Sequence, residues 1–376
     1  MKLFTSGKVS ESKLSSVGKR DGFVDNIRGL VVLLFLMSSV FVNSKGGELA
    51  LPDFFAHTSA WEIINVGKGI IGIKPFGFGL LDLGPIVFYF LIGVVAFLNI
   101  NNKARQRGDA KGLYRSFFVR NLAIMGMGTI GCAIMILLSN DGTFAEPVYS
   151  LTAGNVVYFW SGITAVGFTG VLLTPLVPLV RKTWWAKLIA SLAILTIYTL
   201  ISNNEIFLKF MAKGIEGGMS ACIGFAGALL FVGFLADLMR MKKSIIWYSL
   251  ASVALVGAFI FVLSLPNTPE NPVLFYPRYT IGYIVGALAV VNTVYYVLWI
   301  INKFLLKNRA IPLLAALGRN LLFFLMFTAF FSLLGPVFFG GPIESWNTLL
   351  LYYFSCVLFY FIIAIPLERR KIIIKL

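Results

Sequence analysis

The chain is poor in charged residues, in histidine and in cysteine. Charged residues make up 13% of it, whereas hydrophobic residues make up 58%; soluble domains carry roughly 25% charged residues. Runs of roughly 20 apolar residues recur, and a helical run of that length spans a hydrocarbon core of about 30 Å. Continuous runs such as LIASLAILTIYTLI lack the alternation of a membrane β-strand. The composition predicts an all-α integral membrane protein.

Cysteine and histidine are too scarce, and too scattered, to build a metal site. Cys132, Cys222 and Cys356 all fall inside apolar runs. They form neither a disulfide framework nor a ligand cluster, so we interpret them as small packing residues. His57 is the only histidine and has no cysteine near it. We therefore expect no metal cofactor.

Acidic residues are half as numerous as basic ones, 16 against 32, and the excess has a pattern along the chain. Most lysines and arginines fall in alternate segments, beginning with the N-terminus. The intervening segments hold only Lys45, Lys68, Lys74, Lys209, Lys213 and Arg278. Positive charge gathers on the cytoplasmic side of membrane proteins, so both termini are predicted to be cytoplasmic. The charge is not evidence for nucleic-acid binding, because no basic face belongs to a soluble fold.

The apolar runs predict about ten transmembrane helices. They cover residues 25–43, 81–99, 119–139, 155–178, 186–203, 217–238, 244–264, 279–300, 310–334 and 347–367. Residues 1–22 form a basic cytoplasmic segment, and residues 23–376 form one ten-helix domain with an extracytoplasmic loop at 44–80. Prolines within spans, as in LTPLVPLV, predict kinks.

The loop at 44–80 contains His57 in the stretch FFAHTSAW. This loop is long and apolar, and such loops are often functional or packed onto the fold. His57 is either a general base, a nucleophile or an incidental loop residue. Asp82, at the start of the second span, either caps that helix or orients the imidazole of His57.

Ionisable residues inside membrane spans are functional candidates, because burying them in lipid is unfavourable. Asp25 and Arg28 share a face of the first span and form either a surface ion pair or a cytoplasmic ligand entrance. Asp237 is expected to pair with Arg240 or a nearby lysine. Arg319, inside the ninth span, should face a polar cavity or a carboxylate partner.

Several short motifs occur together. D-x-x-R-G opens the first span, VNSKGG follows it, H-x-S-x-W lies in the outer loop, Asp82-Leu opens the second span, and P-L-L-x-x-L-G-x-N opens the ninth. This set resembles the heparan-α-glucosaminide N-acetyltransferase family and its bacterial relatives, which are multi-pass transmembrane acyltransferases. The matching residues are Asp25, Arg28, Gly29, Asn43, His57, Trp61, Asp82, Gly93, Pro312, Gly318 and Asn320.

The resemblance implies that acetyl-CoA binds from the cytoplasm and passes its acetyl group to a sugar on the far side. His57 would be the base or would carry the acetyl group, Asp82 would hold its tautomer, and Asn43 and Asn320 would lie near the thioester carbonyl. Ser39 stands at the family's spacing after the Arg-Gly pair, so Ser39 or Asn43 fills that role. Arg319 replaces a small or apolar family residue. Arg28, Arg120 and Arg319 are candidate contacts for CoA, since arginine binds phosphate bidentately.

The leading hypothesis is therefore an acyl-CoA-dependent acyltransferase with an extracytoplasmic amino sugar, glycan or lipid-linked sugar as acceptor. A transporter or flippase of a polar lipid or sugar is the alternative, although we find no inverted repeats in the sequence. A structural membrane protein without turnover is a third reading. The outer loops lack N-x-S/T sequons, which favours a bacterial cytoplasmic (inner) membrane. The sequence does not decide whether the protein is a monomer or a homodimer.

Overall fold

The computed structural model describes residues 22–42, 83–95, 110–138, 162–180, 183–202, 218–241, 243–265, 280–306, 311–341, 343–370 and 372. These residues form helices and short turns, with no strand among them. The helices are α2 (Gly22–Val42), an unlabelled helix Leu83–Val95, α5 (Ala110–Leu138), α6 (Gly162–Leu173), α7 (Val177–Val180), α8 (Trp184–Ser202), α10 (Gly218–Leu238), α11 (Ser244–Leu263), α12 (Ile281–Ile301), α13 (Pro312–Arg319), α14 (Leu321–Phe339) and α15 (Trp346–Arg369).

Six helices in the described ranges are long and apolar enough to cross a membrane. They are α2, α8, the Ala221–Leu238 part of α10, α11, α12 with its π-helical extension, and α15. Large apolar side chains stay exposed along α8, α11 and α15, where a bilayer would cover them. This set of helices indicates an integral membrane protein.

Each expected span overlaps a helix among the described residues, but two spans are interrupted. The expected kink at LTPLVPLV is confirmed: α6 ends at Leu173 and α7 starts at Val177 after a turn. The expected single helix over 310–334 is wrong in one respect. It is divided into α13 and α14 at Asn320, whose backbone (φ −114°, ψ 35°) leaves the helical region.

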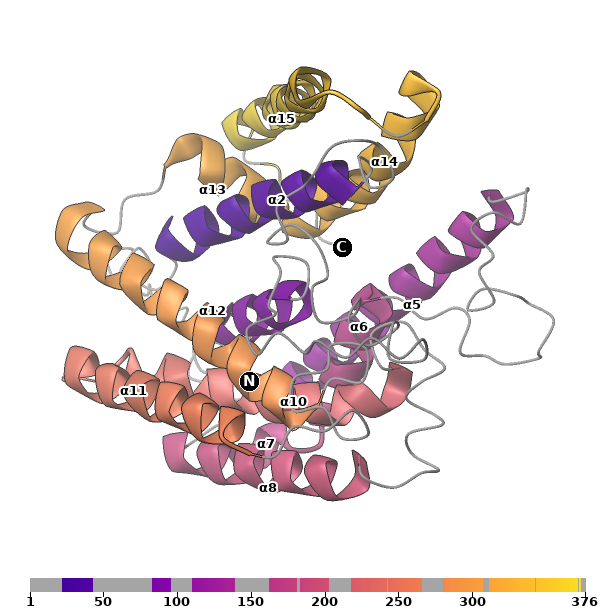
Figure 1. Cartoon of the computed structure of the whole chain (residues 1–376). Coiled ribbons are helices and arrows are strands. Elements are labelled where there is room, and N and C mark those ends of the chain that lie inside the picture. The colour runs from indigo at the N-terminus through magenta and orange to yellow at the C-terminus, as the bar shows by residue number, and fades with distance from the viewer. Residues whose placement is uncertain are drawn as a thin grey trace, which may run out of the picture.

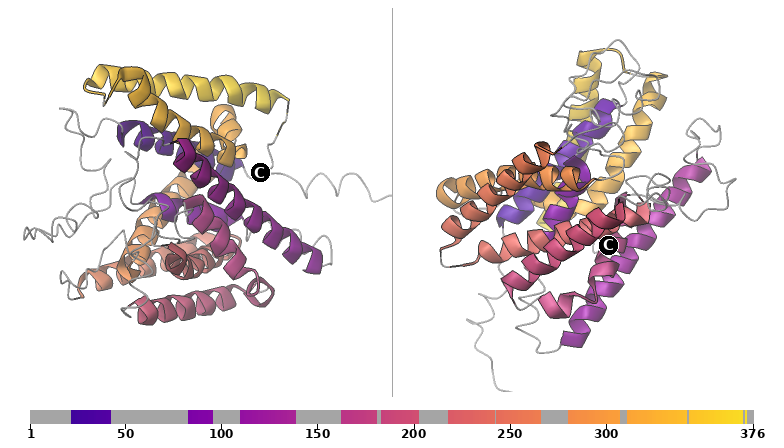
Figure 2. Two further views of the ribbon diagram at one scale, coloured as in Figure 1. Left: turned by 90° about the vertical axis from the view of Figure 1, so that its right-hand side faces the viewer. Right: turned by 60° about the horizontal axis from the view of Figure 1, so that its bottom comes forward.

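Two groups of helices share α2 (Figure 1). One hydrophobic core joins the first turns of α2 to the helix Leu83–Val95, α8, α10, α11 and α12. A second core joins the later turns of α2 to α13, α14 and α15. The two further views show the same division (Figure 2). Because α2 contributes to both cores, it is the central element of the bundle.

Small residues let the other central helix, α10, approach its neighbours closely. A Cβ at Gly224 would meet Ile284 and Tyr198, and a Cβ at Gly227 would meet Leu195. Helix α10 accordingly packs against α8, α6, α11 and α12. Interfaces of this kind are typical of helices in lipid, where close van der Waals packing drives association.

Candidate functional site

The site begins with two glycines at the crossing of α2 and α13. A Cβ at Gly29 would overlap the backbone of Leu314, and a Cβ at Gly318 would overlap the carbonyl of Asp25. The two backbones therefore touch without intervening side chains. This contact brings the D-x-x-R-G motif to the L-G-R-N motif across almost 300 residues of sequence.

Helix α13 is also fixed to α2 at its first turn. The backbone N–H of Ile311 donates to Oδ1 of Asn26 over 2.8 Å. Pro312 then occupies the first turn of α13, where its missing N–H leaves no intrahelical bond unmade. Since α13 is only eight residues long, contacts at both of its ends leave it little freedom to move relative to α2.

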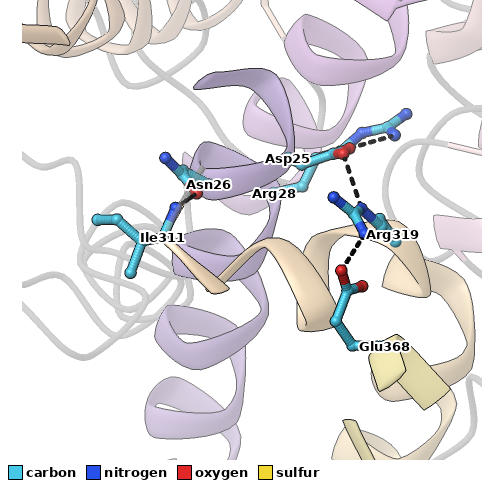
Figure 3. A network of polar contacts seen from close by, with 6 residues as sticks. All are labelled: Asp25, Asn26, Arg28, Ile311, Arg319 and Glu368. Atoms are coloured by element: carbon cyan, nitrogen blue, oxygen red, sulfur yellow. Dashed lines mark hydrogen bonds and ion pairs between the residues drawn. The ribbon is translucent and has the colours of Figure 1, made fainter. Parts of the chain in front are cut away.

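An ion-pair chain runs through this crossing (Figure 3). Oδ1 of Asp25 lies 3.9 Å from Nη1 of Arg28, and Oδ2 lies 3.3 Å from Nε of Arg319. Nη1 of Arg319 in turn donates to Oε1 of Glu368, in the last turn of α15. Three helices are thereby connected by one guanidinium. The expectation that Arg319 meets a carboxylate partner is confirmed, with two carboxylates.

Side-chain exposure rises along the ion-pair chain from Asp25 to Glu368. The side chain of Asp25 is 2% exposed, that of Arg319 25% and that of Glu368 30%. A buried carboxylate requires paired charge, and Asp25 has an arginine at each oxygen. The two arginines and two carboxylates balance. An anion that bound Nη1 of Arg319 would compete with Glu368 for it.

The structure gathers three of the five described candidate residues and separates two. Arg28, Arg319 and Asn320 lie at the crossing, and Asn320 is buried beside it. Ser39 lies on α2 ten residues beyond Gly29, about 15 Å along the axis. Arg120 is exposed on α5, which packs against α6 and α7. His57, Asn43 and Asp82 lie outside the described residues.

Sequence reasoning missed two members of the site. Glu368 is the only acidic residue after Glu344, within the basic run LERRK, and that isolation was the available signal. Asn26 had no signal of its own, because its role depends on the distant N–H of Ile311. Among the described residues, no group of three histidine, cysteine or carboxylate side chains could hold a metal ion.

A second ion pair joins α8 to α10. Lys187, with no exposed side-chain surface, contacts the carboxylate of Asp237. Asp237 therefore has a lysine partner, but Lys187 lies 50 residues away in sequence, whereas the expected partners were Arg240 and the lysines next to it. A separate hydrogen-bonded group joins α11 to α12: Tyr248 donates to Asn292 over 2.7 Å, and Asn292 donates to Ser252 over 2.9 Å.

Comparison with known proteins gives no match to a protein-family model and none to a curated protein. In the part that the structure describes, the crossing of α2 and α13 is the place where the motif residues and the ionisable side chains coincide.

Proposed function

We propose that this protein is a transmembrane acyltransferase. It transfers an acetyl group from cytoplasmic acetyl-CoA to an amino sugar or glycan on the opposite side of the membrane. The observation that carries the proposal is the meeting of the first-span and ninth-span motifs. Gly29 and Gly318 touch, and Arg28, Arg319 and Asn320 gather around that contact. These residues belong to the motif set that resembles the acyltransferase family.

The position of α2 supports a ligand that crosses much of the bilayer. Its first turns carry the arginine cluster, and its last residue, Val42, lies 13 residues beyond Gly29, about 20 Å along the axis. The segment that follows contains His57. In the proposal the phosphate-bearing end of acetyl-CoA lies near Arg28 and Arg319, and its thioester points along α2 toward the outer loop. Asn320 lies at the phosphate end of this path, so we assign it to that end and not to the thioester.

The chemistry needs little beyond positioning and proton removal. A thioester is already activated toward an amine. The unperturbed imidazole pKa, near 6.5, allows neutral His57 to accept the acceptor's proton as the C–N bond forms and the CoA thiolate leaves. General base catalysis of this kind contributes about 10²–10⁴-fold in rate.

The test measures free thiol released from acetyl-CoA by the purified protein, with and without glucosamine. We expect acceptor-dependent release in the wild type and a loss of about 10²-fold or more in His57→Ala. The matched control is Thr58→Ala, which changes the adjacent loop residue and should keep most of the activity. Equal rates in wild type and His57→Ala would remove His57 from the mechanism.

One observation favours the transporter or flippase instead. Transporters commonly bind their substrates at discontinuous helices, and both α6–α7 and α13–α14 are interrupted. A transporter would move labelled glucosamine or a polar lipid across proteoliposome membranes, and the movement would persist in His57→Ala. The acyltransferase should release thiol and show no such transport.

A further inference from the structure

Glu368 has an unusual position in the ion-pair chain. It is bound to Arg319 at the outer, more exposed end of the cluster, whereas Asp25 holds the same guanidinium from the buried side. Glu368 belongs to the last turn of α15, and the exposed residues Arg369 and Arg370 follow it directly. A carboxylate here can leave Arg319 without being buried alone, because it is partly in solvent and has other cations beside it in sequence.

Arg319 keeps its orientation if Glu368 leaves. Its Nε stays against Oδ2 of Asp25, 3.3 Å away, so the guanidinium remains held with Nη1 directed outward. The carboxylate of Asp25 then still contacts both Arg28 and Arg319, while Nη1 of Arg319 has lost the carboxylate of Glu368. A guanidinium held in place in this way is a strong site for a phosphate oxygen.

We propose that Glu368 is an internal anion that occupies a phosphate site on Arg319, and that a phosphate-bearing ligand displaces it on binding. Within the proposed function, the ligand is the phosphate-bearing end of acyl-CoA. The inference rests on that function only for the identity of the ligand. Exchange of one carboxylate for one phosphate links ligand binding to release of the last turn of α15.

The test compares Glu368→Gln with Glu344→Gln in the full-length protein. Both variants remove one carboxylate, and Glu344 is an exposed residue just before the opposite end of α15. Binding of CoA and of inorganic pyrophosphate is measured by calorimetry in a neutral detergent. We expect Glu368→Gln to bind both ligands roughly tenfold more tightly than wild type, since a competing charged hydrogen bond is lost. Glu344→Gln should bind them as wild type does.

A double variant and a measurement on the wild type test the mechanism further. In an Arg319→Gln background, adding Glu368→Gln should have no effect on either affinity. In the wild type, saturating pyrophosphate should speed amide hydrogen exchange in the last turn of α15, because that turn loses its anchor. A purely structural role for Glu368 predicts weaker or unchanged binding in Glu368→Gln and no faster exchange. Either result would overturn the proposal.

The outcomes separate this proposal from the proposed function. Tighter binding of pyrophosphate without any binding of CoA supports displacement of Glu368 and contradicts the acyl-CoA assignment. Acetyl-CoA turnover with equal CoA affinity in all variants supports the acyltransferase and overturns the displacement. Repeating the measurement in nanodiscs with phosphatidylglycerol identifies the phosphate source. Phosphatidylcholine nanodiscs are the comparison. If Glu368→Gln binds CoA and pyrophosphate more tightly than wild type in phosphatidylcholine nanodiscs but not in phosphatidylglycerol nanodiscs, the phosphatidylglycerol headgroup occupies the site. The assignment of a soluble ligand is then overturned.

Discussion

Single glycines decide whether the site can assemble. At Gly29 and Gly318 any side chain would have to occupy space that the partner helix's backbone already fills. Backbone cannot rotate away as a long side chain can, so the helices would have to separate. Not every glycine is constrained in this way: Gly257 on α11 has nothing within 4 Å of an added Cβ.

We expect Gly318→Ala to lower the free energy of unfolding by about 1–3 kcal/mol or more, the usual effect of overpacking. Because α13 must move from Asp25, the change should also weaken CoA binding. Gly257→Ala is the control. It should leave the stability unchanged or raise it by up to about 1 kcal/mol, since alanine favours helix more than glycine does. Thermal unfolding of both variants in detergent, followed by tryptophan fluorescence, checks this. Equal melting temperatures would mean that the α2–α13 contact is looser than described.

Part of the site at the crossing of α2 and α13 could be predicted from the sequence. The apolar run around Arg319 predicts a carboxylate partner, because an unpaired guanidinium is unfavourable in a membrane interior. The run does not say which carboxylate, since Asp25 is 294 residues away in sequence. The isolation of Glu368 within a basic run marks the residue, but its pairing with Arg319 could not be predicted, because that pairing depends on the direction in which α15 returns to α2. Spacing rules act over one or two turns, whereas these partners are set by tertiary packing.

Whole helices are held together by buried polar pairs as well as by apolar contact. Lys187 of α8 and Asp237 of α10 form such a pair near the start of one helix and the end of the other. This arrangement requires the two helices to run antiparallel. Breaking a buried ion pair is unfavourable by about 3–5 kcal/mol, whereas replacing both partners by apolar residues is often neutral.

We therefore expect Lys187→Met to lower the free energy of unfolding by about 3 kcal/mol, because Asp237 is left without its lysine in a mostly buried place. The double variant Lys187→Met/Asp237→Leu should recover to within about 1 kcal/mol of wild type. Lys303→Met is the control. Nζ of this exposed lysine lies 4.9 Å from the Trp299 ring centroid. Its replacement should lower the free energy of unfolding by about 1 kcal/mol or less. Unfolding titrations with sodium dodecyl sulfate in mixed micelles give the comparison. A double variant no more stable than Lys187→Met would show that the pair adds a contact beyond charge compensation.

Helix limits were easier to predict than the break at Asn320. Apolar runs and prolines mark where helices lie and kink, and α8, α10, α11, α12 and α15 follow the expected spans within a few residues. The break has no glycine or proline at its centre; Asn320 stands between Arg319 and Leu321. It coincides instead with the attachment of α13 to α2 through Asn26 and Gly318. Local sequence does not encode an interruption that arises from contacts between distant segments.

At the scale of the molecule, α2 joins the first and last parts of the chain. Its first turn meets Arg319, which also holds the last turn of α15, while Phe41 near its end contacts Trp346 at the start of α15, with ring centroids 6.0 Å apart. Helices α2 and α15 are therefore antiparallel neighbours. The start of α2 and the end of α15 lie on one side of the molecule, an arrangement that is compatible with the even number of membrane crossings predicted from the sequence.

The two ends of α11 and α15 provide a test of this topology. Lys243 and Arg370 lie at the ends rich in basic residues, and Ser264 and Ser345 lie at the opposite ends. The positive-inside rule then predicts that a cysteine replacing Ser264 or Ser345 reacts with an impermeant maleimide in intact cells. One replacing Lys243 or Arg370 should react only after permeabilisation. Cys222 and Cys356 are buried and should give little background once Cys132 is changed to serine. Labelling of positions 243 and 370 from opposite sides would require an odd number of crossings between them. That result would contradict the predicted topology, in which the basic segments that contain Lys243 and Arg370 are both cytoplasmic.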